Sequence, residues 1–269
     1  MPRIDDIFAS LRAQNAKAIM PFICGSHPRP GDTARLLPAL QAAGAHIVEI
    51  GIPFSDPIAD GPIIASAMYD AIQNGANPAS LFSEVASVRD QLSIGLVAMI
   101  SMSIIHRLGD PATFVSKVKA AGFDGLIVPD APLEEATALR AAAIAADLSF
   151  SLLISPNTPP QRLELIAKAC TGFVYVLARV GITGESSGPL QIAPLVDRVR
   201  QATTLPIAVG FGVSTPQHVE TVTSVADAAI VGSALVRRIS QVASEGGDFV
   251  QAASEFVSNL SQGLARNSS

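Results

Sequence analysis

Short apolar runs rich in β-branched residues recur roughly every 25 to 35 residues along the chain. Their length and their flanking glycines and prolines are typical of buried strands. The runs predict strands over Ala18–Cys24, His46–Ile50, Ile94–Ile100, Leu126–Val128, Phe150–Ile154, Phe173–Leu177, Ile207–Val209 and Ala228–Val231.

Amphipathic segments rich in Ala and Leu fill the intervals between these runs. Two of them end at Ala-Gly, with Gly44 and Gly122 at the position after the helix that favours a left-handed residue. Another segment, Ile4–Arg12, precedes the first strand and predicts an extra N-terminal helix over the bottom of the fold. The other predicted helices include Thr33–Ala43, Ile63–Asn74, Pro111–Ala121, Glu134–Ala146, Pro160–Ala169 and Ala193–Ala202.

Regular alternation of strand and helix predicts parallel strands joined by crossover helices. Eight such units in 269 residues predict an α/β fold, a single (β/α)8 TIM barrel. A doubly wound open sheet is the alternative, although no Gly-x-Gly-x-x-Gly follows the first strand. No linker composition divides the chain, so we expect one domain over residues 1–269, with a frayed C-terminal tail from about residue 262.

The composition excludes several classes of binding partner and location. The chain is 49% hydrophobic and 15% charged, its net charge is −5, and it has no Lys/Arg cluster, so we expect no nucleic acid partner. No uncharged apolar stretch reaches the length of a membrane span, and no signal peptide is evident, so we expect a cytoplasmic protein. Cys24 and Cys170 have no metal-ligand spacing, and we expect no metal.

The segment Glu49–Pro62 is the strongest indication of chemistry. Glu49 ends a strand, and Asp56 and Asp60 follow in a loop that three prolines stiffen. A buried carboxylate acquires a raised pKa and can transfer protons near neutral pH. The alternatives are a structural, ion-paired Glu49, an Asp60 that caps the next helix, and an Asp56 that forms a turn.

Asp130 lies in another proline-stiffened loop, after the fourth predicted strand. It could orient groups at the carboxyl ends of the strands, where barrels place their active sites, or it could cap the helix Glu134–Ala146. The residues alone leave both interpretations open.

Glycine-rich loops follow the sixth, seventh and eighth predicted strands, at Arg179–Gly184, Gly210–Ser214 and Gly232–Ala234. Glycine lets backbone N–H groups approach an anion, and the loops after strands seven and eight are the usual phosphate site of this fold. Single glycines also serve sharp turns, but the adjacent loops together predict a phosphorylated ligand. Phe22, Tyr175 and Phe211 lie at strand ends, where they could hold a flat apolar ligand or simply pack in the core.

The pattern as a whole resembles the tryptophan synthase alpha subunit family over about Phe8 to Val236. The most specific match is Glu49–Pro62, which carries the family's signature around both catalytic acids. Supporting matches are Pro21-Phe22, Pro129–Pro132, Arg179–Gly184, Gly210–Ser214 and Gly232-Ser233.

The resemblance implies the retro-aldol cleavage of indole-3-glycerol phosphate to indole and glyceraldehyde 3-phosphate, without a metal or cofactor on this chain. Indole would pass to a β subunit, which would carry pyridoxal phosphate in an α2β2 tetramer. Glu49 and Asp60 would be the catalytic acids. The other implied roles are the indole pocket (Phe22, Tyr175, Phe211), the phosphate site (Gly184, Gly212, Gly232, Ser233), a lid or orienting group (Thr183, Arg179, Asp130) and the β interface (Pro53, Asp56, Pro57).

The chain departs from the family's usual residues at Cys24, His27, Ala65, Ser101 and Ala178. These departures remove polar groups around both acids, and His27 stands in a loop that usually carries an acid. They leave open a weakly active chain that acts mainly as an allosteric partner of the β subunit, and a free-standing lyase. A generic sugar-phosphate isomerase or aldolase would explain the phosphate loops but not the paired acids.

Overall fold

The computed structural model describes residues 2–57, 60–178, 192–210 and 212–265. The strands are β1 (Ala18–Cys24), β2 (Ile47–Gly51), β3 (Gly95–Met99), β4 (Gly125–Ile127), β5 (Ser149–Ser151), β6 (Leu153–Ile154), β7 (Val174–Leu177), β8 (Ile207–Gly210) and β9 (Ala228–Val231). The helices are α1 (Arg3–Ala13), α2 (Asp32–Ala42), α3 (Pro62–Gln73), α4 (Pro78–Val88), the 3-10 turn η1 (Arg89–Gln91), α5 (Met102–Leu108), α6 (Pro111–Ala120), α7 (Thr137–Ala145), α8 (Pro160–Ala169), α9 (Ala193–Ala202), α10 (Pro216–Thr223), α11 (Ser233–Ser244) and α12 (Phe249–Ala265).

All the strand pairs are parallel, in the order β5-β4-β3-β2-β1-β9-β8-β7-β6. Only Leu152 separates β5 from β6, so the two ends of this order are halves of one strand and the sheet closes into a barrel. The break has a local cause. The N–H groups of Phe150 and Leu152 donate to the side chains of Thr171 and Cys170, so pairing with β7 begins only at Leu153. The predicted TIM barrel is confirmed, and the open doubly wound sheet is wrong.

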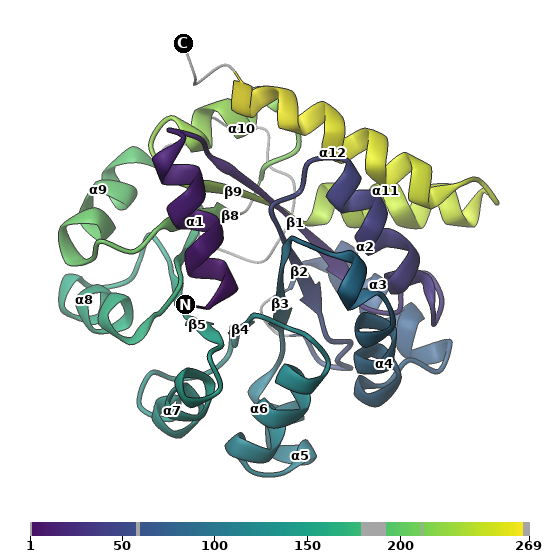
Figure 1. Cartoon of the computed structure of the whole chain (residues 1–269), viewed down its shortest axis with the longest axis horizontal. Helices are drawn as coiled ribbons and strands as arrows, with labels where there is room; N and C mark the ends of the chain where they lie inside the picture. Colours follow the sequence, from purple (N-terminus) through teal and green to yellow (C-terminus); the bar gives the residue numbers. More distant parts are fainter. Residues whose placement is uncertain (1, 58–59, 179–191, 211, 266–269) are drawn as a thin grey trace.

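Alternate residues of each strand face the interior of the barrel. On β2, Val48 and Ile50 belong to the outer layer between sheet and helices, whereas Ile47 packs inside the barrel. Helix α1 covers the bottom of the barrel, as predicted, and its Ile4 and Phe8 join the interior cluster (Figure 1). Glu49, two residues after Ile47, therefore points inward as well.

Helices α2, α4, α6, α7, α8, α9, α10 and α12 surround the strands (Figure 1). Helices α3, α5 and α11 are additional, since each stands between a strand's carboxyl end and the helix that returns along the outside. Helices α3 and α11 pack together at the mouth, where Ile64, Met68 and Val236 form a cluster with Phe22 of β1.

The predicted boundaries hold for several elements, including β1, β9, α8 and α9. Gly44 and Gly122 end their helices at φ +94° and +91°, as expected. The helix predicted from Glu134 begins only at Thr137, because residues 132–136 form a turn on the Pro132 carbonyl. The expected fraying from about residue 262 is wrong as far as Ala265: α12 is helical there, and Gly263 packs against the backbone of Pro216.

Candidate active site

Glu49 lies on β2 with its Cα paired to Phe22 of β1 and to Val97 of β3. Its side chain is fully buried, and neither carboxylate oxygen has a hydrogen-bond partner among the described residues. Burial raises the pKa of Glu49 well above its usual 4.5, because the charged form has lost its water. A neutral carboxylic acid inside the barrel can donate a proton, whereas the alternative of an ion-paired structural acid finds no support in the described ion pairs.

Asp60 comes from the loop between β2 and α3. Burial raises its pKa to about 6. Helix α3 has Gly61 at its N-cap and no side-chain cap, so Asp60 does not cap this helix. Asp60 therefore does not have the helix-capping role that its sequence context allowed, and its raised pKa brings its titration closer to neutral pH.

The phenol of Tyr175, on β7, lies within the electrostatic range of both acids. Burial raises the pKa of its phenol, and the charges of Glu49 and then Asp60 raise it further. A Cβ on Gly210 would lie 2.6 Å from the Tyr175 hydroxyl oxygen, so Gly210 leaves room for the phenol. The structure therefore brings Tyr175 of β7 close to Glu49 and Asp60, which lie on β2 and in the loop after it, more than a hundred residues earlier in the sequence.

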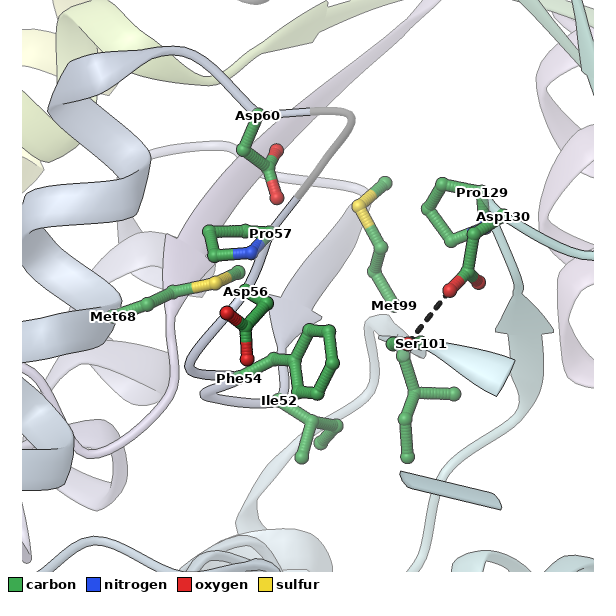
Figure 2. A pocket seen from close by; sticks show the side chains of 11 residues that line it. Ile52, Phe54, Asp56, Pro57, Asp60, Met68, Met99, Ser101, Pro129 and Asp130 are labelled. Carbon is green, nitrogen blue, oxygen red and sulfur yellow. Dashed lines mark hydrogen bonds between the residues drawn. The ribbon is translucent and has the colours of Figure 1, made fainter. Parts of the chain in front are cut away.

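A cleft opens beside Asp60 at the carboxyl ends of β2, β3 and β4. Figure 2 shows the carboxylates of Asp60 and Asp130 approaching it from different loops, with the Met99 side chain between them. Asp130 accepts hydrogen bonds from the Ser101 hydroxyl (2.6 Å) and the Met102 N–H (2.9 Å). It therefore binds the first turn of α5 rather than capping the helix after its own strand, as the alternative proposed. The cleft is lined by Ile52, Phe54, Asp56, Pro57, Asp60, Met68, Met99, Ile100, Ser101, Pro129 and Asp130.

The residues expected at a partner interface differ in exposure. Pro53 is buried, Pro57 is half-buried, and Asp56 is exposed, with its carboxylate accepting a hydrogen bond from the Ser55 hydroxyl (2.6 Å). Among the described residues of this loop, Ser55 and Asp56 are the exposed ones, whereas Pro53 is buried.

The expected phosphate site is partly described. Gly212 has φ +80°, and Gly232 is the N-cap of α11, with no side-chain cap on the helix. Ser233 is the first helical residue, so its hydroxyl lies beside the N–H groups that begin α11. The nearest atoms to a Cβ on Gly232 would be those of Phe22 and Ile64, at 3.9 Å, which places this helix terminus next to the apolar mouth.

Other predicted site residues lie outside the described ranges: Arg179, Thr183, Gly184 and Phe211. Two lining residues, Met68 and Met99, carry no sequence signal that distinguishes them from core methionines. Among the described residues, no group of three or more His, Cys, Asp or Glu side chains could hold a metal ion. No helix in the described ranges is long and apolar enough to cross a membrane.

The departures from the family pattern all lie close to this site. Cys24 is buried in the mouth cluster, and Ala65 is half-buried on α3. Ser101 begins α5, and the N–H of Ala178 donates to Gly210 (2.8 Å), which prolongs the pairing of β7 with β8. His27 is buried and its Nε2 lies 2.8 Å from the Ser240 hydroxyl oxygen, a contact that the sequence did not indicate.

A closed parallel barrel with two buried carboxyl groups of raised pKa on one strand and in the loop after it has the architecture of a (β/α)8-barrel enzyme. The model of the tryptophan synthase alpha chain family matches residues 8–265, and the chain belongs to that family. It is therefore a carbon–carbon lyase of tryptophan biosynthesis, as the sequence predicted.

Individual relatives agree over nearly the whole chain. The tryptophan synthase alpha chain of Chloroflexus aurantiacus is 40% identical over 268 residues, covering 99% of this chain and 100% of that protein. Among solved structures, tryptophan synthase from Mycobacterium tuberculosis in space group F222 matches with a TM-score of 0.88 at 32% identity, over 97% of this chain and 98% of that one. Tryptophan synthase subunit alpha from Legionella pneumophila matches with a TM-score of 0.88 at 30% identity, over 99% of both chains.

Proposed function

We propose that Glu49 and Asp60 form the proton-transfer pair that cleaves indole-3-glycerol phosphate into indole and glyceraldehyde 3-phosphate. The observation that carries the proposal is that both carboxyl groups are buried with raised pKa values, and that the charges of both raise the pKa of the same buried phenol, Tyr175. Two buried carboxyl groups with raised pKa values at one site are what a retro-aldol cleavage on an aromatic ring requires.

The indole ring accepts the bonding electrons only after it has become an indolenine. Glu49, neutral before the reaction, donates its proton to the ring carbon C3, while Asp60 takes the proton from the ring nitrogen. The Glu49 carboxylate then removes the proton of the adjacent glycerol hydroxyl. The C=O bond of the aldehyde forms, the bond to C3 breaks, and its electrons return to the ring as Asp60 gives the proton back to nitrogen. Both acids end in their starting states.

Two further groups of residues would hold the substrate. Phe22 and Tyr175 line the interior beside Glu49, and with Phe211 they would hold the indole ring. The N-terminus of α11 would bind the phosphate through backbone N–H groups and the helix dipole, with Ser233 donating a hydrogen bond. Gly184, Gly212 and Gly232 would complete this cradle, and Arg179 and Thr183 would belong to a loop that closes over it. Asp130 would orient the β3–α5 loop through Ser101.

The family name implies a β-subunit partner, and the exposed tip at Asp56 and Pro57 is the surface that we assign to it. The assembly would be an α2β2 tetramer in the cytoplasm, in which this chain passes indole to the β subunit. The acid–base route needs no cofactor on this chain, and pyridoxal phosphate would belong to the β subunit.

Indole release from indole-3-glycerol phosphate tests these roles. The purified chain is assayed alone and with its β subunit, together with the Glu49→Gln and Asp60→Asn variants. We expect weak activity alone, a large rise with the β subunit, and a loss of about 100- to 10,000-fold in each variant. Wild-type turnover in Asp60→Asn would show that Asp60 does not take part in the proton transfer. A cleavage rate that does not change when the β subunit is added would indicate a free-standing lyase. An inactive chain that still stimulates the β subunit would indicate an allosteric partner.

A further inference from the structure

The β1–α2 loop, which follows Cys24, is held at several points beside the mouth. The Ser26 N–H donates to the Thr33 hydroxyl (2.7 Å), and the Ser26 hydroxyl donates to Glu84 on α4 (2.7 Å). The side chain of Asn74, at the end of α3, donates to the Pro28 carbonyl (3.0 Å). The loop is therefore a fixed support, from which the imidazole of His27 reaches α11.

His27 is only 5% exposed, and its Nε2 lies 2.8 Å from the Ser240 hydroxyl oxygen, across 213 positions of sequence. That hydroxyl also donates to the Val236 carbonyl (3.0 Å), one turn earlier in α11. With the hydroxyl proton directed to that carbonyl, the Ser240 oxygen is left to accept from an N–H at Nε2 of His27, and we adopt this arrangement.

The same face of α11 leads from Ser240 to the candidate phosphate site. The Val236 N–H donates to the Gly232 carbonyl (3.1 Å), so Ser240, Val236 and Gly232 follow one another at one-turn intervals. Val236 is also packed against Phe22 and the inner face of α3. A shift of Ser240 would therefore be carried along a rigid helix to the backbone N–H groups at Gly232 and Ser233.

We propose that His27 is a positioning residue for the phosphate end of the substrate: by donating to Ser240 it holds α11 so that the helix N-terminus stays over the mouth. The proposal rests on the phosphate site proposed above. His27 does not touch the reacting atoms, so it should govern how tightly the phosphate is held and have little influence on the proton transfers of Glu49 and Asp60.

The charge state of His27 fits this role. Burial lowers the pKa of its imidazole, while Asp70 of α3, Asp32 of α2 and the backbone of Ala67 act in the opposite direction. Arg29 and Arg35 line the same cavity beside the ring. Burial therefore favours the neutral ring, which donates to Ser240 when its proton is on Nε2.

Binding of glycerol 3-phosphate by the full chain, measured by calorimetry, and steady-state cleavage with the β subunit test the proposal. Ser240→Ala and His27→Leu each remove the hydrogen bond, and we expect each to weaken glycerol 3-phosphate binding and to raise KM by about three- to tenfold, with kcat within about twofold. His27→Gln keeps a donor at a similar reach and should restore most of the affinity. Ser244→Ala removes a hydroxyl one turn further along α11, where it donates to Gln241 without contacting His27, and serves as the matched control.

The double variant His27→Leu/Ser240→Ala should be no weaker than either single variant, because both remove one interaction. Unchanged affinity in Ser240→Ala, or a fall in kcat with KM constant, would overturn the proposal, as would equal effects of Ser240→Ala and Ser244→Ala. If the wild-type chain itself does not bind glycerol 3-phosphate, the phosphate site is wrong, which is a different outcome from variants that bind as wild type does. Alanine has a higher helix propensity than serine, so Ser240→Ala does not weaken α11 by this route and the test does not depend on the folding of His27→Leu.

Discussion

Phe22 and Glu49 are neighbours across strands β1 and β2: their Cα atoms are partners in the parallel ladder, and both side chains point into the barrel. A ring that excludes water therefore lies beside a carboxyl group whose oxygens have no partner among the described residues. This pairing explains why a glutamate on a barrel strand keeps its proton, and it places the acid against the surface on which a flat ring would rest.

The burial of Glu49 should make stability depend on pH. Its folded-state pKa is raised, so its contribution is fully present below the unfolded value of about 4.5 and is lost as pH rises toward the folded pKa. Glu49→Gln removes this titration, and we expect the variant to gain stability over the wild type between pH 5 and pH 8. Urea denaturation at both values measures the difference, and a difference independent of pH would contradict the assignment.

Asp60 should set the acid side of the pH profile. With its pKa raised to about 6, the carboxylate that accepts the ring N–H proton becomes available only as pH rises through that value. We expect kcat/KM for indole-3-glycerol phosphate cleavage to rise with an apparent pKa of about 6. Asp60→Asn should lose this limb together with most of the rate. A wild-type profile that is flat from pH 5 to pH 7 would exclude Asp60 as the group that titrates.

Gly51 should be required for the position of the Phe22 ring. A Cβ at Gly51 would lie 2.6 Å from the Phe22 ring, so Gly51→Ala must displace it. We expect a loss of about 1–3 kcal/mol in unfolding free energy and a raised KM. Phe22→Leu combined with Gly51→Ala should cost less than the sum of the two single changes, since the smaller side chain leaves room for the methyl group. Additive costs in urea denaturation would show that the ring is not what Ala displaces.

Asp56 should matter for the partner subunit. Its carboxylate is exposed at the tip of the β2–α3 loop, and Asp56→Ala removes that charge without disturbing the buried Pro53. We expect several-fold weaker binding of the β subunit, on the order of 1 kcal/mol, with a greater effect at low salt. Asp6→Ala, on the exposed face of α1 at the opposite end of the barrel, is the matched control in a titration of β-subunit stimulation.

Periodicity was sufficient for the barrel because each strand and its helix repeat the same local pattern. The strands Ala18–Cys24 and Ala228–Val231 were predicted to the residue, since each is a continuous apolar run with a charged residue before it and a glycine after it. The fifth strand was predicted as one element but is divided at Leu152. Side chains from Cys170 and Thr171 cause that division, and no pattern within the strand could reveal it.

In the candidate site, too, local sequence patterns predicted individual residues but not the contacts between distant segments. Glu49 and Asp60 were predicted because they interrupt an apolar strand and a proline-stiffened loop, which are local signals. The contact of His27 with Ser240 joins residues 213 positions apart, and although His27 was noted as a departure from the family pattern, nothing in either segment indicated the other. For Asp130 the local pattern left a helix cap and an orienting role open, and its observed partners, Ser101 and Met102, lie at the start of the neighbouring α5.

Helix α3 begins at Pro62, two residues after Asp60, and helix α11 begins at Ser233, where we place the phosphate of the substrate. Because Ile64 and Met68 of α3 pack in one cluster with Val236 of α11, the span between the acid and the phosphate cradle is fixed by side-chain packing rather than by loop length. A ligand with one carbon more or one fewer between its ring and its phosphate could not reach both ends unless one helix slid along the other. On the proposed site, we therefore expect selectivity for substrate length to depend on the apolar contact between two helices, neither of which supplies a reacting group.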